Sequence, residues 1–309
     1  MTTPLALSTR WNANRHTDGR AMVEEILALG FTRIEVGYDL RPELMEGLLA
    51  MVRERAVEVV SVHNFCPVPP GAPRPHPELY TPGAPDRRER EAAVKHIANT
   101  LRFAAGVGAR VVVCHSGNVD MPNYTYDLLR LAAEGRQYTE PYERLKYKLL
   151  LARDKRAPAQ IAALSASLDA LAPVLAETRV ALALENLPTW EALPTELEAE
   201  QLLRRHAPSG VRFWCDLGHT QIRENLGFIN ATRWLQRLSP WLAGFHVHDV
   251  APPGDDHLMP PHGKTDFTRF AEYAAKDIPL VLEPRPNTPP EDLLAAVPLL
   301  HAAWNFPPP

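Results

Sequence analysis

The chain has 309 residues, of which 45% are hydrophobic and 23% charged, with a mean hydropathy of -0.23. This composition is typical of a soluble globular protein. The chain lacks an apolar run of about 18 residues and a signal peptide, so we expect no membrane-spanning helix and no membrane partner. Three cysteines exclude a disulfide framework and favour a reducing, cytoplasmic location. A net charge of -4 disfavours nucleic acid as a partner.

Short apolar runs alternate with longer amphipathic stretches along the chain. The apolar runs predict strands over residues 4–8, 33–37, 59–63, 110–115, 180–185, 211–216, 243–248 and 279–283. The amphipathic stretches predict helices near residues 20–29, 41–55, 86–107, 158–177, 194–206, 228–238, 266–276 and 290–303. Apolar strands separated by helices indicate a parallel sheet buried on both faces. Eight such units predict a closed (β/α)8 TIM barrel, with residues 1–309 forming a single domain.

Two connections are too long for simple turns. Residues 67–85, after the third predicted strand, are rich in proline and therefore stiff and extended. Residues 116–157, after the fourth strand, carry a polar loop and then a basic stretch. Both leave the carboxyl ends of strands, where barrels hold their active sites, so they are either surface insertions or walls of a functional pocket.

Six consecutive predicted strands end in an acidic side chain or an imidazole. These strand-end residues are His63, His115, Glu185, Asp216, His246 and Glu283, and His219, His248, Asp255 and His257 follow shortly after two of them. A single strand-end histidine is more often a hydrogen-bonded structural residue than a ligand. Six in succession lie around one pocket in a barrel and are costly to bury without a shared partner.

The clustered carboxylates and imidazoles predict a divalent metal ion. Uncompensated carboxylates repel one another, and a divalent cation removes that penalty. The mixed oxygen and nitrogen donors favour zinc or manganese, with cobalt, iron or magnesium as alternatives. Cys114 and Cys215 each precede a strand-end residue and face the opposite side of their strand, so we expect them in the core. No glycine-rich phosphate-binding motif occurs, which predicts the absence of a nucleotide cofactor.

The segments VHNFCP, VVVCHSGN, ALENLP, CDLGHTQI, FHVHDV, DDHLMPPHGKTDF and LVLEP together resemble the xylose isomerase-like barrel superfamily. The resemblance extends from about residue 5 to 300 and is most specific at the Asp-x-x-His of the sixth strand and at the Asp-x-His that ends in His257. This superfamily includes sugar and sugar-phosphate isomerases and epimerases, and apurinic endonucleases of the endonuclease IV type. The resemblance therefore implies the barrel fold and one of these two activities.

The two branches imply different metal centres. In the isomerases and epimerases, the matching residues Glu185, Asp216, His246 and Glu283 would bind one ion, with Glu185 and Glu283 as the catalytic proton carriers. In the endonucleases, three zinc ions would be bound. His63 and His115 would then hold a first ion together with Glu185, and His219, Asp255 and His257 would hold a third. Otherwise these five residues would contact the substrate.

Glu35 and Asp39 follow the second predicted strand, and we expect them near the mouth of the pocket, where an acid suits a sugar hydroxyl better than a phosphodiester. Substrate contacts are also predicted for Glu35, His248, Lys264 and Arg285. The leading prediction is a metal-dependent sugar, sugar-phosphate or keto-sugar isomerase or epimerase that abstracts a proton and forms a metal-stabilised enediolate. The alternatives are a zinc-dependent phosphodiesterase or apurinic endonuclease and a non-catalytic barrel. A homo-oligomer is compatible with the sequence.

Overall fold

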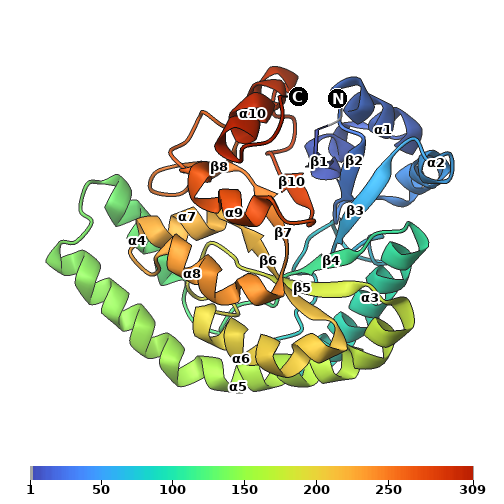
Figure 1. Ribbon diagram of the computed structural model, residues 1–309. Helices are drawn as coiled ribbons and strands as arrows, with labels where there is room; N and C mark the ends of the chain where they lie inside the picture. The colour runs from blue at the N-terminus through green and yellow to red at the C-terminus, as the bar shows by residue number, and fades with distance from the viewer. Residues whose placement is uncertain (1–2, 309) are drawn as a thin grey trace.

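The computed structural model describes residues 3–308, and within this range eight parallel strands close a barrel that is surrounded by helices (Figure 1). The barrel strands are β1 (Leu5–Ser8), β2 (Arg33–Val36), β3 (Glu58–His63), β4 (Val111–Cys114), β5 (Ala181–Glu185), β6 (Val211–Asp216), β7 (Leu242–Val247) and β10 (Leu280–Leu282). Strands adjacent in sequence pair in parallel, and β10 closes the ring between β7 and β1. The predicted (β/α)8 barrel is confirmed. That residues 1–309 form one domain stays a prediction.

The helices cover the outer face of the barrel and connect its strands. Their bounds are α1 (Gly19–Ala28), α2 (Pro42–Arg53), α3 (Arg87–Gly106), α4 (Tyr124–Ala133), α5 (Glu140–Thr178), α6 (Glu196–His206), α7 (Leu217–Asn225), α8 (Ala231–Leu238), α9 (Ala271–Ala274) and α10 (Pro290–Ala303). A short antiparallel pair, β8 (Asp249–Ala251) and β9 (Asp255–Leu258), follows β7 and was not predicted.

The segment after β4 differs from the expected long loop. Residues 116–157 include α4 and the N-terminal half of α5, a 39-residue helix that begins well before the predicted 158–177. The basic stretch there consists mainly of good helix formers, and Glu140 and Glu143 in the first turn favour helix initiation. Residues 67–85 contain turns but no helix or strand, as the proline content predicts. Figure 1 shows α4 and the start of α5 projecting beyond the barrel as an arm.

Helix α5 meets a length-and-composition criterion for a membrane-spanning helix, although the sequence showed no uninterrupted apolar run of that length. It is long and apolar enough by length and composition, with a mean hydropathy of 1.5 over its most apolar 18 residues. The second half of the helix is rich in alanine and leucine because it packs on the barrel, where Leu164, Leu168 and Leu171 are fully buried. Helices that cover the core of a globular protein meet the same criterion.

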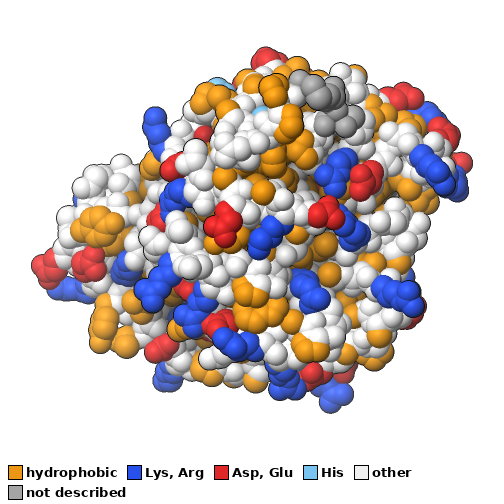
Figure 2. All heavy atoms as spheres, in the orientation of Figure 1, with side chains coloured by type: hydrophobic (Ala, Val, Ile, Leu, Met, Phe, Trp, Pro, Cys, Tyr) orange, Lys and Arg blue, Asp and Glu red, His pale blue; other side chains and the backbone are white. Residues whose placement is uncertain are grey.

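One apolar cluster fills the barrel, and a second, larger one surrounds it. Inside, small and branched residues such as Ala6, Val113 and Val281 pack around Trp214. Outside, a larger cluster joins the strands to the helices, and it includes Cys114 and Cys215 as expected. Over the face shown in Figure 2, Lys and Arg side chains are interspersed with Asp and Glu.

The packing of the barrel interior determines which side chains reach the site. On β5, β6 and β10, a residue of the inner cluster is followed two positions later by an acidic residue. Successive side chains of a strand alternate between its faces, so these acids continue the inward-facing rows beyond the apolar filling. The rows place Glu185, Asp216 and Glu283 at the carboxyl end of the barrel.

Candidate metal centre and catalytic cavity

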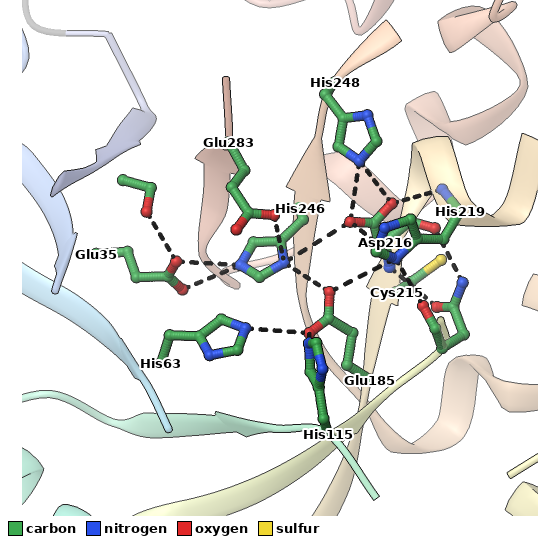
Figure 3. Close-up of polar contacts among 12 residues, drawn as sticks. Glu35, His63, His115, Glu185, Cys215, Asp216, His219, His246, His248 and Glu283 are labelled. Atoms are coloured by element: carbon green, nitrogen blue, oxygen red, sulfur yellow. Dashed lines mark hydrogen bonds and ion pairs between the residues drawn. The ribbon is translucent and has the colours of Figure 1, made fainter. Parts of the chain in front are cut away.

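Four buried side chains from neighbouring strands converge at the carboxyl end of the barrel (Figure 3). Glu185, Asp216, His246 and Glu283 each offer one ligand atom, and these atoms all lie within 4.8 Å of one another. This is the set that the resemblance implied for a single metal ion. One imidazole nitrogen and three carboxylate oxygens suit manganese, zinc, cobalt or ferrous iron.

His246 occupies the centre of this group and presents a defined nitrogen to it. Its Nδ1 lies 2.9 Å from Oε1 of Glu185 and 3.3 Å from Oε2 of Glu283. On its other side, Nε2 lies 3.1 Å from Oε2 of Glu35 and donates to that carboxylate (Figure 3). A histidine whose distal N–H is bonded to a carboxylate is oriented for metal binding through the other nitrogen.

Glu35 lies beneath His246, in the barrel interior, and not at the mouth of the cavity where we expected it. Its carboxylate is fully buried and also accepts hydrogen bonds from the hydroxyls of Ser8 and Ser61. The side chain at the end of β2 follows the same inward-facing alternation as the other strand-end acids, which explains its depth. Asp39 is only partly buried, but neither acid lines the cavity described below.

The electrostatics of the cluster match a site for a cation. Burial raises the pKa of Glu185, but the charge of His246 and a hydrogen bond from His115 outweigh it, so that this pKa lies well below its ordinary value. Burial likewise opposes ionisation of Glu283, and His246 and Arg10 reverse its effect and lower that pKa. The carboxylates in turn raise the pKa of His246 against the effect of burial. A protonated imidazole thus balances the acids where a divalent ion would, so the residues fit the metal that the sequence predicted.

A second group gathers on the other oxygen of Glu185. Nε2 of His63 lies 3.3 Å from Oε2, and Nε2 of His115 lies 3.1 Å from the same atom. His63 donates through Nδ1 to the backbone carbonyl of Asn64, so its Nε2 lone pair faces a carboxylate oxygen. Two acceptors at this distance need a proton or a cation between them. The structure thus brings His63, His115 and Glu185 together, as the resemblance to the endonucleases implied.

The three residues that the resemblance implied for a third zinc ion, His219, Asp255 and His257, are only partly brought together. His219 and His257 lie together, but the third member of their group is His248. Asp255 has a side chain that is 60% exposed and pairs with Arg285 on the surface. The positive φ of 51° at His257 interrupts the alternation of β9, which explains why two residues at Asp-x-His spacing point to different places. Asp255 is thus not placed as a ligand.

His248 supports Asp216 and does not face the substrate cavity. Its Nδ1 accepts a hydrogen bond from the backbone N–H of His257, so its Nε2 carries the proton and donates to Asp216 at 3.1 Å. The imidazole passes directly over Gly218, where a Cβ would lie 1.9 Å from Cε1 of His248. The glycine in the Asp-Leu-Gly-His sequence is therefore required by this close approach.

A cavity of about 490 Å³ opens above these four candidate ligands. Glu185, Glu283, His63, His115, His219 and His257 contribute to its floor, and the segments after β3, β4 and β5 form its walls. Lys264 and Arg285, predicted as substrate contacts, are exposed and do not line it. Glu191, from the loop after β5, lines the cavity and was not singled out in the sequence.

Arg10 is the principal residue that sequence reasoning missed. It follows β1 and donates to Oε1 of Glu283 at 2.8 Å, while its guanidinium lies 4.7 Å from the centre of the Tyr38 ring. Its position directly after the first strand is the same kind of strand-end location that identified the other site residues. A basic side chain at a strand end is a natural partner for the acidic strand ends, and this is the signal in the sequence that could have identified Arg10.

Comparison with known proteins identifies the family of this chain. The family profile described as xylose isomerase-like TIM barrel matches residues 23–299. A search among curated proteins found no match.

Solved structures share the fold at low sequence identity. A D-tagatose 3-epimerase-like protein is 16% identical over 97% of both chains, with a TM-score of 0.70. The 3-keto-D-glucoside 4-epimerase of E. coli is 17% identical over 97% of this chain and 100% of its own, with a TM-score of 0.69. A Thermus thermophilus protein soaked with zinc chloride is 21% identical over 98% of both chains, with a TM-score of 0.61. From the profile match over most of its length, this chain belongs to the xylose isomerase-like TIM-barrel family.

Proposed function

We propose that this protein is a metal-dependent isomerase or epimerase of a sugar or keto-sugar, which works by moving a proton between carbon and a carboxylate. The observation that carries the proposal is the position of two carboxylates. Glu185 and Glu283 reach the floor of the cavity, whereas Asp216 and His246, on the two strands between them, are fully buried beneath it. Several structural neighbours are epimerases by name, including the enzymes for 3-keto-D-glucoside and D-psicose.

The two glutamates have the properties of paired proton carriers. Their lowered pKa values keep both ionised near neutral pH, so either can accept the proton of a substrate carbon. Arg10 holds Oε1 of Glu283, which leaves Oε2 directed toward the cluster. In isomerisation, the glutamate that removes the carbon-bound proton returns it to the adjacent carbon. In epimerisation, the other glutamate takes up a proton from solvent and delivers it to the opposite face of the same carbon, while the first releases its proton to solvent. A divalent cation in the four-residue site would supply Lewis-acid polarisation of two neighbouring substrate oxygens.

Two histidines on the cavity floor are suited to receive substrate hydroxyls. His219 donates through Nδ1 to the carbonyl of Asn186, and His257 donates through Nδ1 to the carbonyl of Glu283. Both Nε2 atoms are therefore left as acceptors. Burial and the neighbouring His248 lower the pKa of His257 to about 4, which keeps it neutral. We assign these two residues to substrate contact.

The alternative function, hydrolysis of phosphodiesters by clustered zinc, has one observation in its favour. His63, His115 and Glu185 form a group that can hold a further ion. The displacement of Asp255 to the surface removes a ligand of the third zinc, so we rank this alternative second. The cytoplasmic location and a homo-oligomer stay predictions from the sequence.

The test is solvent exchange at carbon. The protein is loaded with Mn²⁺ or Zn²⁺ and incubated in heavy water with a panel of ketoses and aldoses, and deuterium incorporation and new epimers are followed by NMR. We expect exchange with at least one sugar and little or none with the Glu283→Gln variant. Cleavage of duplex DNA at an abasic site, with every sugar unlabelled, would contradict the proposal and support the hydrolase.

A further inference from the structure

The charges that line the cavity are unfavourable to an anionic substrate. Its lining contains the carboxylates of Glu78, Glu185, Glu191, Asp256 and Glu283. Arg10 is the one Lys or Arg among the lining residues, all of which belong to the described part of the chain, and its guanidinium is paired with Glu283. His115 also lines the cavity, and Glu185 and Glu78 raise its pKa to about 9, so it adds one positive charge. The five carboxylates still exceed the charges of Arg10, His115 and an added divalent ion, so a phosphate group on the substrate would be repelled.

Loops after the seventh and eighth strands of TIM barrels frequently bind phosphate through backbone amides. Here the connection after β7 forms such a cradle, but Asp249 of the same chain occupies it. The Asp249 carboxylate is buried and accepts from the backbone N–H groups of Val250 at 2.8 Å, Gly263 at 2.7 Å and Thr265 at 2.9 Å. A Cβ on Gly263 would lie 2.3 Å from Oδ1 of Asp249, so glycine permits this closed arrangement.

The N-terminus of α4 at the cavity rim is occupied in the same way. Helix N-termini bind anions through their free N–H groups. Glu191 accepts from the backbone N–H groups of Tyr124 at 2.7 Å and Thr125 at 3.1 Å, and the Asn123 side chain accepts from the backbone N–H of Tyr126. The amide cradle after β7 and the helix N-terminus at the cavity rim are thus both closed by internal carboxylates.

The remaining lining groups suit a neutral polyhydroxylated molecule. Asn118, Asn123 and Thr189 offer uncharged donors and acceptors, and Leu187 and Pro188 offer apolar surface. Sugars present hydroxyls at their edges and C–H groups on their faces, so such a wall binds them without a formal charge. This wall lies on the loops after β4 and β5.

From these four observations we propose that the substrate is an unphosphorylated sugar, whose uncharged part lies against the wall formed by Asn118, Asn123, Leu187, Pro188 and Thr189. The inference rests on the proposed function and narrows it, because the family resemblance by itself allowed sugars and sugar phosphates equally. Selection against the phosphate arises from the acidic lining and from the two occupied amide cradles.

The test uses matched pairs on the metal-loaded protein: D-fructose with D-fructose 6-phosphate, and D-ribulose with D-ribulose 5-phosphate. Deuterium exchange in heavy water gives kcat/KM for each. We expect at least one free sugar to exceed its phosphate by about tenfold or more. A preference for a phosphate would overturn this inference while supporting the proposed function. Abasic-site cleavage without exchange in any sugar would overturn both.

A second measurement does not depend on finding the right sugar. Inorganic phosphate is added to the metal-free protein at constant ionic strength, with chloride as the control. We expect phosphate to give no saturable increase in Tm at low millimolar concentration, and a saturable increase would reveal an anion site and overturn the inference.

A variant tests the role of charge directly. Tyr126 lies at the cavity rim and is 64% exposed, so Tyr126→Arg adds a cation there, with Tyr126→Gln as the matched neutral control. The arginine variant should reduce the disadvantage of the phosphorylated sugar by about tenfold, while the glutamine variant should leave it unchanged. Equal behaviour of the two variants would refute the charge argument.

Discussion

The contact between Glu35 and His246 leads to a prediction about metal affinity. Glu35 is remote from the cavity, yet its carboxylate accepts the Nε2 proton of His246 at 3.1 Å and thereby directs Nδ1 toward the three acidic ligands. In Glu35→Gln the negative charge is lost, and the amide can donate to Nε2, which would move the imidazole proton to Nδ1. The nitrogen that faces the metal site would then lack its lone pair.

Loss of such a partner weakens metal binding by about 10- to 100-fold, which corresponds to about 1.4 to 2.7 kcal/mol. The assay is titration of the metal-free protein with Mn²⁺ or Zn²⁺ by calorimetry. The control is Glu58→Gln, at the exposed start of β3, which should leave the affinity unchanged. Circular dichroism checks that both variants are folded. If a folded Glu35→Gln variant bound metal as tightly as the unmodified protein, our account of His246 would be refuted.

Three further predictions concern the same centre. Glu185→Gln and Glu283→Gln should each reduce turnover by about 100-fold or more without unfolding the barrel, as measured by steady-state rates and circular dichroism. Removal of divalent ions with a chelator should abolish activity and lower Tm, and both should recover when Mn²⁺ or Zn²⁺ is restored; activity that survives complete removal would argue against a metal enzyme. Gly218→Ala should displace His248 from Asp216 and raise the Kd for the metal, because the new methyl group would overlap the imidazole. An unchanged Kd in a folded variant would show that Asp216 does not depend on that contact.

The positions of the candidate ligands at the strand ends were predictable from sequence because side chains alternate regularly along a strand. Every second side chain of a barrel strand faces inward. An acid or imidazole at such a position, at the end of an apolar run, therefore extends into the site. Glu185, Asp216, His246 and Glu283 all obey this rule, and the structure brings them together.

The failures occurred where the chain leaves that regular geometry. Asp255 lies in a hairpin whose alternation is interrupted, so its spacing from His257 did not reveal its direction. Glu35 obeyed the alternation, but its depth depends on where the strand ends relative to its neighbours, and the sequence does not contain that register. The amide cradle around Asp249 joins residues up to 16 positions apart through backbone groups, which have no sequence signature.

The arm formed by α4 and the first half of α5 supports one side of the cavity from outside the barrel. Its side chains, including Leu128, Tyr142 and Leu149, form an apolar cluster distinct from those of the barrel, and Met121 of the cavity wall packs on this cluster. The same cluster includes Ile222 and Leu226 at α7, the helix that follows Asp216, so the arm is joined there to the elements that carry the candidate ligands. Substitutions at exposed positions of the arm should cost the barrel little free energy of unfolding, so the part of the cavity lining that Met121 provides can vary while the strand-end residues stay the same.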